Sequence, residues 1–388
     1  MIAPRADQVT AFRRAAAEHL EALLDLTAQV ATIPAPTGNE AARAAFVMDW
    51  WSNLRLPGLG APAIDELHDV VAEVSGRKRG PAVLLAAHLD TVFPIDTALN
   101  VRRDADRLHG AGIGDNSLGV AALLMVPRLL YSMNLTPGVP IVLAAPVGEE
   151  GLGNLRGMRA VMDRCPDVGG AIAIEGHNLG RVTYAAVGSK RLRVVTTGPG
   201  GHSWGDYGRP SAIHVLARLI AELTSVPIPH EPKTSFNVGI IEGGISINTI
   251  APSASMLVDL RSIDANALAE VASEVERIIN GFRCPEISVQ FQVLGERPAG
   301  SVGEDAAIVD IAKRSLTALG ITPALDASST DANIPISRGI PAICLGLTSG
   351  GNVHRPDEYV DIAPVADGFA QLAMTTVNLA NHLAAGAP

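Results

Sequence analysis

The sequence has 388 residues, a length that one hydrophobic core seldom fills, so two domains are expected. Hydrophobic residues make up 47% of it and charged residues 18%, which is typical of a folded α/β protein and excludes extensive disorder. The formal net charge of -10 has the same sign as phosphate backbones and anionic lipids. This balance argues against a nucleic-acid or membrane-surface partner and favours a small-molecule substrate.

The first residues and the most apolar stretch indicate a protein without a membrane segment. Residues 1–9 carry charges where a secretory signal needs an apolar core. The longest apolar stretch, residues 120–133, is interrupted by Pro127 and Arg128 and is too short to span a bilayer. We therefore expect a cytoplasmic protein with no transmembrane helix.

Four apolar runs of the kind that form buried parallel strands each lead to acidic or imidazole side chains. The runs are residues 82–87, 141–146, 170–174 and 341–345, and the residues that follow are His88 and Asp90, Glu149 and Glu150, Glu175, and His354. Helical patterns at 117–133 and 154–163 separate the runs, which predicts a doubly wound α/β sheet. Ligands bind such sheets beyond the carboxyl ends of the strands, so we expect one shared site.

The pattern of elements changes over residues 189–299. Strands are expected at 190–197, 234–242, 255–262 and 286–294, and helices with one apolar stripe at 210–224 and 266–281. This βαββαβ order predicts a two-layer α+β domain inserted into a catalytic domain formed by residues 1–188 and 300–388. The two middle strands should be antiparallel, and an outer strand could remain free for pairing in a dimer.

The cysteines exclude one kind of metal site. Cys165, Cys284 and Cys344 lie far apart and form no CxxC motif, so neither a disulfide framework nor a thiolate zinc site is indicated. Any metal must therefore be held by oxygen and nitrogen atoms.

His88, Asp90 and Asp115 are the first candidates for such donors. An imidazole can bind a divalent metal through one nitrogen while a nearby carboxylate orients it through the other, although an isolated HxD sequence is more often an ordinary surface pair. Asp115 lies in a glycine-rich turn before a helix, where it could either cap that helix or bridge two cations.

The remaining candidates follow the other apolar runs. The vicinal pair Glu149 and Glu150 could divide two roles, because successive side chains diverge and one can bind metal while the other acts as a general base. Glu175 adds a carboxylate and His354 a second imidazole, whereas His109 and His177 have equal merit in isolation. Together, two histidines and three carboxylates suit two zinc ions, with cobalt or manganese as competitors.

With these residues in place, the chain resembles the M20 metallopeptidase family over nearly its whole length. The shared motifs occur in family order: HLDTVF at 88–93, GIGDNSLG at 112–119, GEEGLGN at 148–154, GPGGHS at 198–203, INTIAP at 247–252, STDAN at 329–333 and HRPDEYV at 354–360. The resemblance implies His88 and Glu175 on one metal, Glu150 and His354 on the other, and Asp115 bridging both. It also implies that Asp90 orients His88 and that Glu149 is the base.

The same resemblance assigns roles to the inserted domain, which is similar to the family's lid and dimerisation domain. His202 resembles a histidine that reaches the partner subunit's site and stabilises the oxyanion, although alone it would be a histidine in a polar loop. Asn248 and Arg261 resemble residues that hold the substrate, and the alternative for Arg261 is an ion pair with Asp259 or Asp264. One departure is Glu175, where many members have Asp.

These residues lead to a hypothesis of amide hydrolysis beside a free carboxylate. Two metals would activate a water, Glu149 would take its proton and return it to the leaving nitrogen, and His202 would share the oxyanion charge. The substrate could be a small peptide or an N-acyl amino acid, and a homodimer through the inserted domain is expected. A silent binding protein of the same fold is the alternative, whereas no GxSxG elbow near a strand end supports a serine hydrolase.

Overall fold

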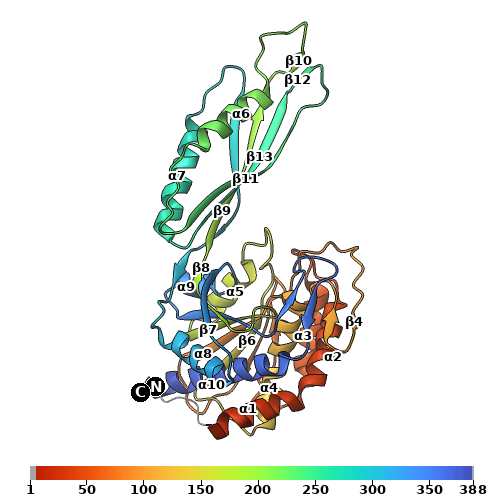
Figure 1. Ribbon diagram of the computed structural model, residues 1–388, viewed down its shortest axis with the longest axis vertical. Helices are drawn as coiled ribbons and strands as arrows, with labels where there is room; N and C mark the ends of the chain where they lie inside the picture. Colours follow the sequence, from red (N-terminus) through yellow and green to blue (C-terminus); the bar gives the residue numbers. More distant parts are fainter. Residues whose placement is uncertain (1–5, 387–388) are drawn as a thin grey trace. The chain divides into compact units, whose positions relative to one another are not determined.

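The computed structural model describes residues 6–386, which form two compact units (Figure 1). Unit 1 consists of the described residues up to Ala186 together with those from Ser301 onward, and unit 2 is Val187–Gly300. The expectation about a signal sequence falls partly on residues 1–5, which lie outside the described residues.

Unit 1 is built on a mixed sheet, in which nine strands are described. Their order is β1-β2-β6-β3-β7-β17-β8-β15, with β16 paired to β8. The strands are β1 (Ala63–Ile64), β2 (Val70–Val74), β3 (Ala82–Ala86), β6 (Ile141–Ala145), β7 (Val168–Glu175), β8 (Arg181–Ala186), β15 (Gly300–Ser301), β16 (Ala324–Ser328) and β17 (Ala342–Gly346).

The four strands predicted from apolar runs are neighbours at the centre of this sheet. β6, β3, β7 and β17 are adjacent and parallel, whereas β2 and β8 flank them in antiparallel pairs. All residues of β3, β6 and β17 are buried, as expected for strands covered on both faces. The carboxyl ends of the four strands therefore lie along one edge, which confirms the predicted α/β architecture.

Helices cover both faces of the sheet and bury the alternating residues of each strand (Figure 1). Val83 and Leu85 of β3 belong to a core cluster with α1 (Ala6–Glu18), α2 (Leu20–Ala31), α3 (Ala41–Asn53), α4 (Gly119–Ser132), α8 (Ala307–Ala318) and α10 (Val365–Gly386). Leu84 and Ala86 point to the other face and pack with α5 (Arg156–Arg164) and α9 (Asn333–Ser337). Two apolar layers thus hold the sheet rigidly.

The helix α4 confirms the helix predicted at residues 117–133, and it continues through Pro127, which interrupts the apolar stretch of the sequence without ending the helix. Proline removes one intrahelical hydrogen bond, but the residues around Pro127 are buried and hold the helix in place. Among the described residues, one helical stretch, Ile113–Ser132, is long and apolar enough to cross a membrane, and its most apolar part is 89% buried inside the protein. It is a core helix of unit 1.

A small antiparallel sheet brings two distant segments of unit 1 together. Its order is β18-β19-β5-β4, formed by β4 (Arg102–Arg103), β5 (Arg107–His109), β18 (Gly350–Gly351) and β19 (Tyr359–Asp361). Residues 110–118 follow β5 in the chain, and residues 352–358 connect β18 to β19. The pairing of β5 with β19 therefore holds the predicted Asp115 turn near the loop that carries His354.

Unit 2 contains the six elements expected from the sequence, with small shifts at their ends. They are β9 (Gly188–Thr197), α6 (Ala212–Leu223), β11 (Thr234–Gly243), β13 (Ser253–Ser262), α7 (Ala265–Gly281) and β14 (Ser288–Arg297). The strands form an antiparallel sheet in the order β11-β13-β9-β14, which confirms the predicted pairing of the two middle strands. A short pair not predicted, β10 (Gly201–His202) with β12 (Thr249–Ile250), lies beyond this sheet.

Candidate metal centre

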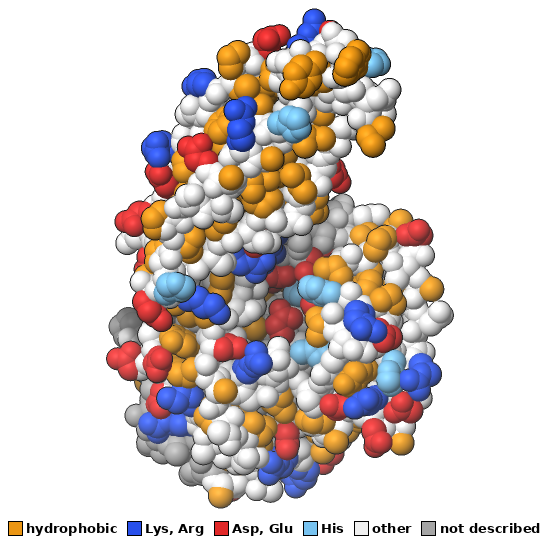
Figure 2. Space-filling view, turned by 45° about the horizontal axis from the view of Figure 1, so that its top comes forward, with side chains coloured by type: hydrophobic (Ala, Val, Ile, Leu, Met, Phe, Trp, Pro, Cys, Tyr) orange, Lys and Arg blue, Asp and Glu red, His pale blue; other side chains and the backbone are white. Residues whose placement is uncertain are grey.

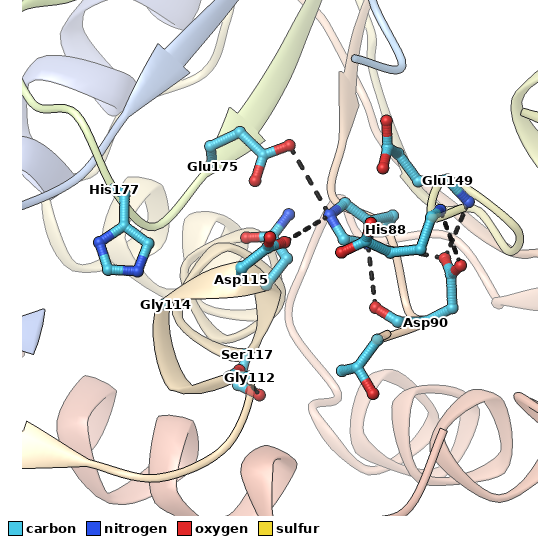
Figure 3. A network of polar contacts seen from close by, with 12 residues as sticks. His88, Asp90, Gly112, Gly114, Asp115, Ser117, Glu149, Glu175 and His177 are labelled. Carbon is cyan, nitrogen blue, oxygen red and sulfur yellow. Dashed lines mark hydrogen bonds and ion pairs between the residues drawn. The ribbon is translucent and has the colours of Figure 1, made fainter. Parts of the chain in front are cut away.

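His88 follows β3 and lies, almost fully buried, between two carboxylates (Figure 3). Its Nε2 is 3.2 Å from Oδ1 of Asp115 and 3.7 Å from Oε1 of Glu175, the last residue of β7. These three side chains offer donor atoms within 4.8 Å of one another. They form the first donor group.

Asp115 also belongs to a second donor group, with His354 and Glu150. Nε2 of His354 is 3.0 Å from Oδ2 of Asp115 and 3.3 Å from Oε1 of Glu150. Their donor atoms again lie within 4.8 Å of one another. Because Asp115 presents a different oxygen to each histidine, its carboxylate lies between the two groups.

The turn that carries Asp115 depends on glycine and on an anchor to β7. Gly112 has φ 68°, and an added Cβ would lie 2.9 Å from the side chain of Thr91, so a larger residue would be strained there. The buried Asn116 donates a 2.7 Å hydrogen bond to the carbonyl oxygen of Ile174, next to Glu175. The turn is therefore attached to the strand that supplies another member of the first donor group.

Asp90 holds the loop after β6 as well as lying beside His88. Its oxygens accept hydrogen bonds of 2.9 Å from the backbone N–H groups of Glu149 and Glu150, and one of 2.8 Å from Oγ1 of Thr37. Nδ1 of His88 is 3.6 Å from its Oδ1. Asp90 thereby connects the end of β3 to the end of β6.

The electrostatic field of the cluster attracts positive charge. Burial acts to lower the pKa of His88, but the carboxylates of Glu175 and Asp115 together with Asp90 raise it well above its usual value. The hydrogen bond with Asp115 and the neighbouring carboxylate of Glu150 raise the pKa of His354 to about 10. Burial acts to raise the pKa of Asp90, but the hydrogen bonds from His88 and two backbone amides lower it to about 2.

The donor set fits divalent cations. Imidazole and carboxylate are ligands that zinc and other transition metals accept, and no thiol contributes to either group. The buried Oε1 of Glu150 receives no hydrogen bond from the residues that the structure describes, so a buried acceptor remains available. Glu149, also buried, forms a further donor group with His88 and Glu150.

The predicted residues of unit 2 lie at its β10–β12 pair and on β13. His202 and Asn248 lie close together, because His202 is on β10, which pairs with β12, and Ser203 N–H donates to the carbonyl oxygen of Asn248. Both side chains are exposed. Arg261, on β13, donates a 2.7 Å hydrogen bond to Asp259, which also pairs with Arg191.

Several residues at the centre were not identified from the sequence. Thr37 carries no motif, and Arg43, 1% exposed, donates to the carbonyl oxygens of Leu89 and Ile33. Glu358 lies inside the HRPDEYV motif among charged neighbours, so its burial could not be predicted from the local sequence. It accepts a hydrogen bond from the backbone N–H of Asp115. Of the two histidines of equal merit, His109 pairs with Asp104 and His177 contacts Glu358.

The model of Peptidase family M20/M25/M40 matches residues 84–378. The chain belongs to this family. M20 enzymes are metal-dependent hydrolases, and the chain is therefore an M20 metallohydrolase whose donor groups could bind metal. The resemblance inferred from the motifs is thus confirmed.

Individual relatives agree with this assignment. Succinyl-diaminopimelate desuccinylase of Corynebacterium glutamicum is 24% identical, covering 89% of this chain and 94% of that protein. The crystal structure of aminopeptidase PepT of Bacillus cereus matches with a TM-score of 0.76 at 20% identity, covering 93% of this chain and 99% of that chain. The di-peptidase Dug1p of Saccharomyces cerevisiae matches with a TM-score of 0.75 at 13% identity, over 96% and 98%. The two structures show that the M20 fold spans the chain.

Proposed function

We propose that the protein is a dinuclear metal hydrolase that cuts the amide bond of small peptides or N-acyl amino acids with a free carboxylate. The observation that carries this proposal is the position of Asp115, with one oxygen 3.2 Å from His88 and the other 3.0 Å from His354. A carboxylate between two groups of N and O donors is what a bridged pair of cations requires.

In the proposed centre, His88 and Glu175 would hold one cation, Glu150 and His354 would hold the other, and Asp115 would contribute to both sites. Zinc is the expected metal, and cobalt or manganese could replace it. Bound there, the two cations would supply a lowered pKa for the attacking water and polarisation of the amide carbonyl. Asp90 would fix the orientation of His88, whose Nδ1 lies 3.1 Å from the backbone carbonyl oxygen of Asp90 and 3.6 Å from its carboxylate.

Glu149 is proposed as the general base. Its carboxylate is buried and close to both His88 and Glu150, and Asp90 fixes its backbone. From there it would accept a proton from the attacking water and return it to the leaving nitrogen, so that the reaction consumes one water and releases an amine and an acid. His202 would donate to the oxyanion that forms on the carbonyl oxygen.

The substrate class rests on unit 2 and on the relatives. Arg261 and Asn248 would bind the carboxylate and carbonyl of the substrate, since a guanidinium pairs well with a carboxylate. A desuccinylase among the relatives favours an N-acyl amino acid, and structural neighbours named as an aminopeptidase and a di-peptidase favour peptides. Both classes present an amide beside a free carboxylate.

The proposal includes a cytoplasmic homodimer that forms through unit 2. Its edge strand β11 exposes Ile240 at 49% and Ile241 at 55%, and several patches of hydrophobic side chains lie on this unit's visible surface (Figure 2). An apolar edge strand of this kind is suited to pairing with another copy. Light scattering of the purified protein would measure its mass, and a monomer at micromolar concentration would contradict this part of the proposal.

The proposed function is tested by combining metal analysis with a substrate screen. Zinc-loaded and cobalt-loaded protein would be incubated with a panel of dipeptides, tripeptides and N-acyl amino acids, and the products identified by mass spectrometry. We expect two equivalents of bound metal and cleavage of one of these classes. Metal binding without cleavage of any compound would instead favour a silent binding protein.

Glu149→Gln tests the assigned base. Because the substitution keeps the shape of the side chain but removes its basicity, we expect unchanged metal content and a turnover lower by about 10²- to 10⁴-fold. Glu66→Gln, an exposed glutamate of the same unit, is the matched control. A Glu149→Gln enzyme with wild-type turnover would show that the base is another group.

A further inference from the structure

Glu358 is a fully buried glutamate whose carboxylate lies under the turn that carries Asp115. Its Oε1 accepts hydrogen bonds from the backbone N–H groups of Gly114 at 3.0 Å and Asp115 at 2.9 Å. Its Oε2 accepts one from the N–H of Gly112 at 3.0 Å. Three backbone donors of one short turn thus converge on a single side chain.

His177 lies in the segment that follows β7, beside the turn that contains Gly114 (Figure 3). Its Nε2 is 2.7 Å from Oε1 of Glu358, and the imidazole is nearly buried. Gly114 and Gly350 make room for the ring, because an added Cβ would lie 2.1 Å and 2.7 Å from its atoms. Gly114 of the turn and Gly350 of β18 are therefore required by the position of His177 beside Glu358.

Glu358 also belongs to the loop that carries His354. Its N–H donates to the carbonyl oxygen of Arg355, and its own carbonyl oxygen accepts from the N–H of Gly110 at 2.9 Å. The side chain therefore connects the loop of His354 to the turn of Asp115. His354 and Asp115 are two of the three residues in the second donor group.

We propose that Glu358 is a positioning residue that sets the separation between Asp115 and His354 and thereby the affinity of the second donor group for its cation. A carboxylate suits this role because it only accepts hydrogen bonds, and its four neighbours are three backbone N–H groups and the His177 ring nitrogen. A glutamine would place an amide N–H₂ against a donor on one side. The inference rests on the proposed function, because it concerns the same pair of cations.

Two measurements on Glu358→Gln test this role. In metal-free protein, we expect faster hydrogen–deuterium exchange at the amides of residues 112–115, because one of their acceptors is lost. In a zinc titration, we expect one of the two equivalents to bind about 10- to 100-fold more weakly, the usual cost of losing a group that orients metal ligands. Excess zinc should then restore turnover toward the wild-type value.

Two further variants separate positioning from general destabilisation. Leu316→Ala removes a buried side chain of α8, and we expect it to lower the unfolding temperature without changing either zinc affinity. Glu358→Asp keeps the charge but retracts the carboxylate, so it should also weaken one equivalent. It takes the place of Glu358→Gln if that protein does not fold.

The outcomes distinguish this inference from the proposed function. If wild-type protein binds two zinc ions and the Glu358 variants bind both with unchanged affinity, Glu358 has no positioning role and the proposed function stands. The same conclusion follows if amide exchange at residues 112–115 is unchanged. If wild-type protein binds no pair of cations, the proposed function itself fails.

Discussion

His88 and Asp90 at the edge of the sheet in unit 1 are held differently from His202 on the β10–β12 pair of unit 2. His88 is 2% exposed, and Asp90, which accepts two backbone N–H groups, is fully buried. His202 is exposed, and its Nδ1 accepts from the backbone N–H groups of Trp204 and Gly205. Trp204 is itself 88% exposed.

This difference indicates separate roles for the two units in the proposed reaction. Donors fixed by buried hydrogen bonds cost little reorganisation when a cation binds, so the unit 1 edge is suited to hold metal. Exposed groups act strongly on a reacting atom after water has been excluded around them. We therefore expect metal binding to depend on unit 1 and transition-state stabilisation to depend on unit 2 as well.

Asp115→Ala should have the largest effect, because both donor groups lose their shared carboxylate. We expect the protein to retain neither cation and turnover to fall to the background of the assay. Metal analysis after dialysis and the substrate assay measure the two losses. Asp106→Ala, an exposed residue near the same small sheet, is the control; an Asp115→Ala protein with two bound cations would remove the basis of the comparison.

His202→Ala should act on turnover while leaving the metal in place. Removal of one oxyanion donor typically lowers kcat by about 10²- to 10³-fold. Metal content should equal that of wild type, since His202 is not in either donor group. His230→Ala, another exposed histidine of unit 2, serves as the matched variant. Loss of metal in His202→Ala, or unchanged kcat, would contradict the division between the units.

Asp69→Asn should have the smallest effect on turnover. It should instead change how the free energy of unfolding depends on pH. Burial raises the pKa of Asp69 to about 7, although it accepts a hydrogen bond from the N–H of Val147. Between its ordinary pKa of 3.8 and about 7, the unfolded chain releases the proton that the folded protein keeps. The free energy of unfolding therefore falls as pH rises through this window, by at most about 1.4 kcal/mol per pH unit.

Denaturant unfolding from pH 4 to pH 8 measures this slope. The Asp69→Asn variant should lack this contribution, whereas Asp96→Asn at an exposed position should follow wild type. Identical slopes in wild type and Asp69→Asn would show that Asp69 is ionised in the folded protein. Asp90 provides the opposite case. Its pKa is lowered, because the contacts with His88 and two backbone N–H groups outweigh the effect of burial.

Local sequence patterns predicted the sheet and the convergence of its strand ends. Apolar runs identify buried strands, and parallel neighbours end at the same edge, so His88, Glu150 and Glu175 could be expected together. The short β10–β12 pair escaped prediction because two residues cannot display a period. The helix predicted at residues 117–133 is confirmed as α4, whose buried apolar residues lie on both sides of Pro127.

The supporting contacts of the centre were less predictable than its donors. Thr37, Arg43 and Glu358 form hydrogen bonds with residues that are distant in the chain. The sequence separations are 53, 46 and 243 residues, respectively. No spacing rule relates such positions, and each residue type is common on surfaces. His177 could be separated from His109 once tertiary structure placed one beside Glu358 and the other beside Asp104.

The buried guanidinium of Arg43 has a consequence for how the proposed enzyme receives an anion. Burial lowers its pKa to about 10, so it remains positive near neutral pH. Two divalent cations would leave one excess negative charge on the five carboxylates of the centre, which are Asp90, Asp115, Glu149, Glu150 and Glu175. Arg43 would neutralise that excess, and a loaded centre with no net charge would admit a carboxylate-bearing molecule that the bare acidic cluster repels.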